Sequence, residues 1–143
     1  MPFVRISVYA ETPTDIRKAI ADSVYEAMRE TIGIPDGDRF ILVSSHNADE
    51  WFIDPTFPGL QRSAKFVLIH ITLSRGRTVE QKQALYARIA ERLHESAMIL
   101  PDDVMIVLSE NNFEDWSFGK GQAQYVLNPP AWLAKPPNER THE

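Results

Sequence analysis

The stretch DRFILVSSHNADEW, residues 38–51, decides the fold of this 143-residue chain, because DVMIVLSENNFEDW, residues 103–116, repeats it 65 positions later. The two halves align without a gap. Upstream, KAIADSVYEAMRETI (18–32) falls on QALYARIAERLHESA (83–97), and the apolar residues in both recur at helical spacing. Self-similarity at a fixed period is the signature of a duplicated structural unit. We therefore expect both halves to have the same succession of elements.

Each half is predicted to form a strand, a helix and a second strand. In the first half, Thr12 can cap a helix in which Pro13 takes the first helical position, and this helix should end before the GIPDG segment. In the second half, TVEQ is a capping-box pattern that begins at Thr78, and its helix should run to about Ala97. The expected strands are Phe3–Tyr9, Arg39–Ser45, Lys65–Leu73 and Val104–Glu110.

This order of elements predicts an α/β chain of the α+β kind. Two β-α-β units with right-handed crossovers make a four-stranded mixed sheet with both helices on one face. The other face stays uncovered, and an uncovered apolar face needs a partner. We therefore expect an oligomer.

Two segments lie outside the repeat, the linker FIDPTFPGLQRSA and the tail from Ser117. The tail contains SFGKGQAQYVL, which predicts a glycine turn followed by a short strand that is free to pair with a neighbouring subunit. The last residues are too rich in proline to belong to a core. We expect one domain over residues 1–128 and a proline-rich tail over residues 129–143.

Composition excludes several classes of protein. The formal net charge is −5, and no basic stripe with interleaved aromatic residues suits nucleic acid. There is no cysteine for a disulfide framework, and no apolar run is long enough to cross a membrane. The start of the chain lacks the layout of a signal peptide, so a cytoplasmic protein is expected.

Common catalytic sites are also missing from the sequence. The four histidines do not have the spacing of metal ligands, and neither a G-x-S-x-G elbow nor a Walker loop occurs. No metal and no cofactor is therefore expected.

Pro2 follows the initiator Met at the start of the first strand. It has two interpretations. A proline is tolerated at the head of a strand because it has no ladder hydrogen bond to lose there. Alternatively, removal of Met1 would turn Pro2 into a secondary amine, which is both a nucleophile and a base.

The segment SRGRT, residues 74–78, lies between a strand and a helix N-terminus. Arg75 and Arg77 alternate around Gly76, so both guanidinium groups can point the same way and hold a carboxylate. An ordinary solvated charged loop is the alternative. Asp38 has the place of a turn residue, and the aromatic residues of NFEDWSFG (112–119) suit core packing.

These stretches carry a resemblance. MPFVRI, IPDGDRF, QRSAKFVLIH, SRGRTVEQKQ and DDVMIVLSENNFEDWSFGKGQAQYV look like the tautomerase superfamily, and in particular the malonate semialdehyde decarboxylase family. The likeness runs from residue 1 to about residue 127. It implies a homotrimer of β-α-β-β-α-β subunits, each with an N-terminal proline in its own active site.

The resemblance also assigns roles to single residues. It implies that Pro2, Asp38, Arg75 and Arg77 are catalytic, and that the two arginines also bind the substrate. An aromatic wall is implied around the substrate, and its members are Trp116, Phe118 and Tyr125.

Three functions remain open at this point. The first is a cofactor-independent lyase that decarboxylates a 3-oxo acid such as malonate semialdehyde to acetaldehyde and CO2, with hydratase activity on unsaturated acids as a side reaction. The second is a keto–enol tautomerase of 2-oxo acids such as phenylpyruvate. The third is a trimeric binding protein without catalysis, which retention of Met1 would favour, because the nitrogen of Pro2 would then be an amide.

Overall fold

The computed structural model describes residues 1–131, and every structural statement below concerns that part of the chain. Its long elements come in the predicted order. They are β1 (Phe3–Tyr9), α1 (Thr14–Ile32), β2 (Ile41–His46), β3 (Val67–Ser74), α2 (Val79–Ala97) and β4 (Val104–Asn111). Short helices follow or precede them: η1 (Ala48–Glu50), η2 (Pro101–Asp103), η3 (Phe113–Asp115) and α3 (Gln124–Leu127). None of the described helices has the length and apolar character that a membrane span needs.

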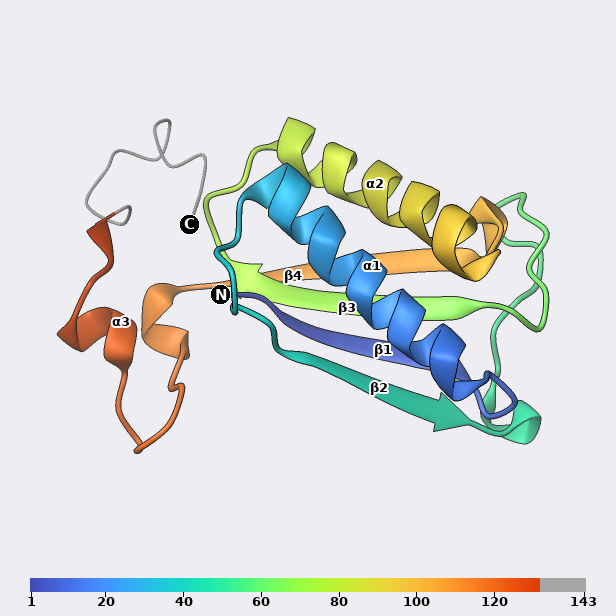
Figure 1. Ribbon diagram of the computed structural model, residues 1–143, viewed down its shortest axis with the longest axis horizontal. Coiled ribbons are helices and arrows are strands. Elements are labelled where there is room, and N and C mark those ends of the chain that lie inside the picture. Colours follow the sequence, from blue (N-terminus) through green and yellow to red (C-terminus); the bar gives the residue numbers. More distant parts are fainter. Residues whose placement is uncertain (132–143) are drawn as a thin grey trace.

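The four strands form one mixed sheet with the order β2-β1-β3-β4. The outer pairs, β1 with β2 and β3 with β4, are parallel, whereas the central pair of β1 and β3 is antiparallel. Both long helices cover the same face of the sheet (Figure 1). The predicted fold is thus confirmed.

The repeat is visible in the backbone. The helices α1 and α2 begin at Thr14 and Val79 and have 19 residues each, so their starts lie 65 positions apart. In the central antiparallel pair, Arg5 lies opposite His70, which is its own counterpart in the repeat. A pseudo-two-fold axis therefore passes through this residue pair, and it relates the two ends of the sheet to each other.

The core lies between the sheet and the helices. Every second residue of β1 and of β3 is buried, as a strand with one covered face requires. The apolar stripes of the helices meet these side chains. The buried apolar residues at the centre include Val4, Ile6, Ile69, Ile71, Ile20, Val24, Leu85 and Ile89.

The helix ends follow the sequence in three cases out of four. At α2, the Thr78 hydroxyl accepts from the Gln81 N–H and the Gln81 side chain accepts from the Thr78 N–H, as predicted. At its other end, α1 stops at Gly33, whose φ of 64° is accessible to glycine without strain. The predicted cap by Thr12 is wrong: Pro13 is the N-cap and α1 has no side-chain cap there.

The segment after β4 differs from the expectation. Residues 124–127 form the short helix α3 and not a strand, so the predicted pairing of this segment with a neighbour has no basis in the structure. The side chain of Gln124 accepts from the Phe118 N–H and donates to the Gly119 carbonyl, which folds the segment back on itself. The predicted tail from residue 129 lies, beyond residue 131, outside the described residues.

The uncovered face of the sheet is mixed in character. Leu42, Met105 and Val107 are 40–50% exposed on it. Arg5 and His70 lie on the same face, and the His70 ring is hydrogen-bonded to the Ser109 hydroxyl. The predicted bare face exists, although polar residues divide its apolar surface.

Candidate active site

Strand direction brings distant segments to one end of the sheet. Phe3 lies opposite Thr72 in the antiparallel pair, so the start of β1 lies beside the end of β3. The strand β2 runs parallel to β1, which brings the residues before it to the same end. Figure 1 shows the N-terminus, the loop before β2 and the loop between β3 and α2 meeting there.

Pro2 and Asp38 lie together at this end. Pro2 is buried. The amine of Met1 lies 3.7 Å from Asp38 Oδ2, and both side chains are only about one-tenth exposed. A carboxylate beside the amino terminus stabilises the positive charge there. Asp38 therefore has the position from which it can hold an ammonium group at the start of the chain.

The two predicted arginines occupy the loop between β3 and α2, in different environments. Arg77 is half-buried, and its Nη1 donates to the Ser74 carbonyl over 2.9 Å. Arg75 is exposed, and its backbone N–H donates to the Asn111 carbonyl over 2.9 Å. Gly76 between them has a φ of 129°, which L side chains rarely adopt. The glycine thus permits a backbone conformation in this loop that another residue would adopt only with strain.

The predicted aromatic residues form a cluster beyond the end of β4. The rings of Trp116 and Phe118 have centroids 5.8 Å apart, and Tyr125 packs edge-on against Phe118 at 4.9 Å. Trp116 Nε1 donates to Asn111 Oδ1 over 2.8 Å. Asn111 therefore ties the aromatic cluster to β4, and through its carbonyl it also ties the arginine loop to the same strand end.

Sequence reasoning missed two residues of this site. Asn111 has the linking role just described. The hydroxyl of Ser74 is fully buried and has no hydrogen-bond partner within residues 1–131. The repeat gives Asn111 and Trp116 the counterparts His46 and Trp51, and in the structure Trp51 donates to the backbone carbonyl of His46. Nothing in the sequence pointed to Ser74.

Groups that could hold a metal are not found in the described part of the chain. No three His, Asp or Glu side chains gather there in a suitable arrangement. What the site offers is a chain terminus beside a carboxylate, two guanidinium groups and an aromatic cluster. Such a set can bind a small acid and transfer protons to it.

Comparison with known proteins places the chain in a family. Two family models described as "Tautomerase enzyme" match it, one over residues 38–119 and one over residues 2–61. A probable tautomerase of Bacillus subtilis strain 168, YusQ, is 36% identical over 126 residues, which are 88% of this chain and 99% of that protein. The chain belongs to the tautomerase family of enzymes.

Solved structures agree with this assignment. A malonate semialdehyde decarboxylase inhibited by 3-bromopropiolate is 38% identical, with a TM-score of 0.84 over 90% of this chain and 98% of its own. A second malonate semialdehyde decarboxylase, studied for its decarboxylase and hydratase activities, is 31% identical, with a TM-score of 0.82 over 87% of this chain and 96% of its own. A fused 4-OT, solved as a symmetric trimer, shares the fold at 20% identity, with a TM-score of 0.73 over 88% of this chain and 98% of its own.

Proposed function

We propose that this enzyme decarboxylates a 3-oxo acid such as malonate semialdehyde, using the amine of Pro2 after Met1 has been removed. The observation that carries the proposal is that Pro2, Asp38 and the Arg75–Arg77 loop lie at one end of the sheet, where Asn111 links this loop to the aromatic cluster. The likeness to two malonate semialdehyde decarboxylases over most of the chain supports it.

The arginines would hold the substrate by its carboxylate. Guanidinium groups bind carboxylates through charge-assisted and often bidentate hydrogen bonds. Their benefit to the rate is orientation, because contacts that stabilise only the bound acid would slow its loss of CO2. The breaking bond must lie perpendicular to the plane of the carbonyl group, and two fixed guanidinium groups can impose that angle.

The electron pair of the breaking carbon–carbon bond needs a sink. In one route the aldehyde oxygen receives the pair and a donor such as protonated Pro2 stabilises the enolate. In the other, the Pro2 amine condenses with the aldehyde, releases water and forms an iminium ion that receives the pair. A proton then replaces CO2 on carbon, and in the second route water releases acetaldehyde and restores the amine.

Asp38 and the aromatic cluster would favour this chemistry from two sides. Asp38 would hold the protonated amine, or orient a water for the hydration of unsaturated acids. Trp116 and Phe118 would present an apolar surface to the substrate. A charged carboxylate is unfavourable beside such a surface, whereas neutral CO2 is not, so the surface would favour decarboxylation.

A tautomerase acting on 2-oxo acids such as phenylpyruvate is the second candidate. It is favoured by the similarity to a probable tautomerase at 36% identity. The protonation state of the amine distinguishes the two functions. A neutral Pro2 can abstract a proton, as a tautomerase requires, whereas a protonated Pro2 can polarise a carbonyl group, as decarboxylation requires. Two arginines lower the pKa of a neighbouring amine, and an ionised Asp38 raises it.

Three measurements test whether the amine is used. The intact mass of the protein should show that Met1 is absent, and 3-bromopropiolate should add once, at Pro2. Pro2→Ala keeps a free amine but removes the ring, and it should lower the rate by about 10²–10⁴, as expected for one positioned acid–base group. A folded Pro2→Ala protein with full activity on 3-oxo acids and phenylpyruvate would overturn the proposal, and so would retention of Met1 in the active protein.

A further inference from the structure

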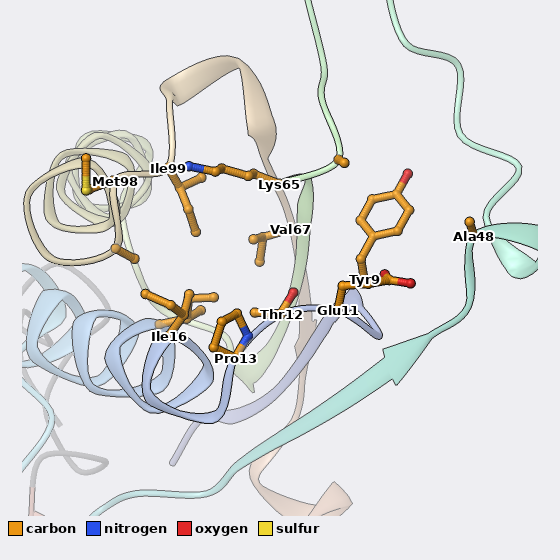
Figure 2. A pocket seen from close by; sticks show the side chains of 13 residues that line it. Tyr9, Glu11, Thr12, Pro13, Ile16, Ala48, Lys65, Val67, Met98 and Ile99 are labelled. Carbon is orange, nitrogen blue, oxygen red and sulfur yellow. The ribbon is translucent and has the colours of Figure 1, made fainter.

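A cavity lies at the opposite end of the sheet from Pro2. Its volume is about 620 Å³, and it lies where β1 ends and β3 begins, between the start of α1 and the end of α2 (Figure 2). A cavity of this size is large enough for a small organic ligand. Its lining is mainly apolar and includes Pro13, Ile16, Ile20, Val67, Met98 and Ile99.

The pseudo-two-fold axis relates this cavity to the Pro2 end. Because Arg5 pairs with its own counterpart His70, each residue at one end has its repeat partner at the other. Val67, which lines the cavity, is the counterpart of Pro2, and Thr12 is the counterpart of Arg77. By the repeat, the cavity therefore occupies the place that corresponds to the surroundings of Pro2 and Arg77 at the other end of the sheet.

The groups that would perform chemistry at the Pro2 end have no equivalent in this cavity. Val67 lies inside the chain, so its nitrogen is an amide and cannot act as a base. Asp103, the counterpart of Asp38, is buried, and its carboxylate accepts hydrogen bonds from the N–H and the hydroxyl of Ser63, each over 2.6 Å. It is thus engaged in holding the linker and does not face a ligand as an open carboxylate. Catalysis of the Pro2 kind is excluded here by these substitutions.

The cavity nevertheless has features that suit the binding of a ligand. Lys65 lines the cavity, and Figure 2 shows its side chain running past Val67 toward Ile99, above the apolar floor. An ammonium group at the rim of an apolar hollow favours a ligand with one negative end and an apolar body. The other charged group of the lining, Glu11, is exposed and lies beside Tyr9 in the same view.

We propose that this cavity binds a small monocarboxylic acid with an apolar body and does not convert it. The carboxylate would contact Lys65, and the body would contact Ile16, Val67 and Ile99. Glu11 would disfavour a second carboxylate on the ligand by like-charge repulsion, so dicarboxylates should bind more weakly. The inference depends on Lys65 and on the lining, and therefore stands whichever reaction Pro2 performs.

The test uses the full chain with labelled isoleucine and valine methyl groups, and 3-phenylpropionate as the probe. Titration should shift the NMR signals of Ile16, Val67 and Ile99 in a saturable way. The uncharged 3-phenylpropionamide should bind more weakly. Lys65→Gln should lower the affinity for the acid about three- to tenfold and leave that for the amide unchanged. Lys18→Gln, a matched change on α1 at a residue that does not line the cavity, should alter neither.

A second variant tests the contribution of the apolar lining. Ile16 is half-buried at the rim, and Ile16→Trp should fill the hollow and abolish binding of both probes, while turnover at the Pro2 end stays unchanged. The proposal is overturned if the three methyl signals do not respond to the acid, or if Lys65→Gln binds acid and amide as the wild type does. It is also overturned if these signals shift with protein concentration alone, since a second copy of the chain would then occupy the cavity.

Discussion

Asp38 and Asp103 show how one repeat position acquires two roles. Both residues precede the second strand of their half. Asp38 lies 3.7 Å from the amine of the chain, whereas Asp103 is 2% exposed and holds Ser63. The difference arises because β1 begins at a chain terminus and β3 continues from the linker. A free amine is available at one end only, so only one aspartate can serve it.

Replacement of each aspartate should separate the two roles. Asp103→Ala removes the buried carboxylate that accepts from the N–H and the hydroxyl of Ser63, so the free energy of unfolding should fall by about 1–3 kcal/mol. Asp38→Ala should lower turnover and change the melting temperature less. Chemical denaturation and steady-state kinetics of both variants provide the measurement. An Asp38→Ala protein with full activity and an Asp103→Ala protein with wild-type stability would contradict this division.

The arginines allow a second prediction at the level of residues. Arg75→Ala and Arg77→Ala should each reduce kcat/KM for acidic substrates, because each removes charge-assisted contacts worth about 1.5–3 kcal/mol. Arg77→Ala should also lower the melting temperature, since Arg77 donates to the Ser74 carbonyl and Arg75 is exposed. Lys18→Ala, at a solvated cation on α1, is the control and should match the wild type. Wild-type kinetics in both arginine variants would make the segment an ordinary charged loop.

Between elements, Glu30 links the two long helices. It lies on α1, and it accepts from Arg88 Nε over 2.5 Å and from Arg92 Nη2, both on α2. The hydrogen bond from Arg88, followed by that from Arg92, lowers the pKa of Glu30 below its ordinary value of 4.5. A carboxyl whose pKa falls on folding stabilises the protein above its unfolded-state pKa, and this contribution is lost as the pH falls through the folded-state pKa.

Glu30→Gln should therefore destabilise the protein in a pH-dependent manner. At pH 7 we expect a loss of about 0.5–1 kcal/mol in the free energy of unfolding, because the pair is partly solvated. As the pH falls below 4.5 the difference from the wild type should shrink, and it should be lost only once the pH has passed through the lowered pKa of Glu30 in the folded state. Thermal unfolding across this pH range measures it. Glu95→Gln, an exposed change on α2, is the control, and an equal loss in both variants would contradict the prediction.

For the whole molecule, the uncovered face of the sheet is the surface through which we expect subunits to assemble. Leu42, Met105 and Val107 remain exposed there, and the resemblance noted in the sequence implies a homotrimer. Burial of such side chains against a second copy is favourable. We therefore propose that this enzyme is a homotrimer that packs through this face.

Val107→Asp should break the trimer, because it places a charge within the interface. Ala84→Asp introduces the same charge on the exposed surface of α2, four residues before Arg88, and should leave the trimer intact. Sedimentation velocity at micromolar concentration distinguishes the two forms. A wild-type protein that sediments as a stable monomer would contradict the assembly, and so would a trimeric Val107→Asp variant.

Local patterns failed at two places in the chain. The segment QYVL (124–127) has β-forming residues, but Gln124 joins Phe118 and Gly119 by hydrogen bonds and a short helix results. Thr12 precedes a helix start and yet does not cap it, because Pro13 occupies the N-cap position. In the first case the hydrogen bonds of Gln124 outweighed β propensity, and in the second the backbone restriction of Pro13 outweighed the capping propensity of Thr12.

The sequence by itself determined the order of the elements and the duplication, and its family resemblance singled out Pro2, Asp38 and the two arginines. It could do so because helix and strand periodicity are local properties, and because the two halves confirm each other. Only the tertiary structure decided the bond of Trp116 to Asn111, the buried hydroxyl of Ser74 and the cavity beside Lys65. These depend on which side chains fill the space between distant segments, and on the pseudo-two-fold axis through Arg5 and His70, which exists only once the two halves have paired.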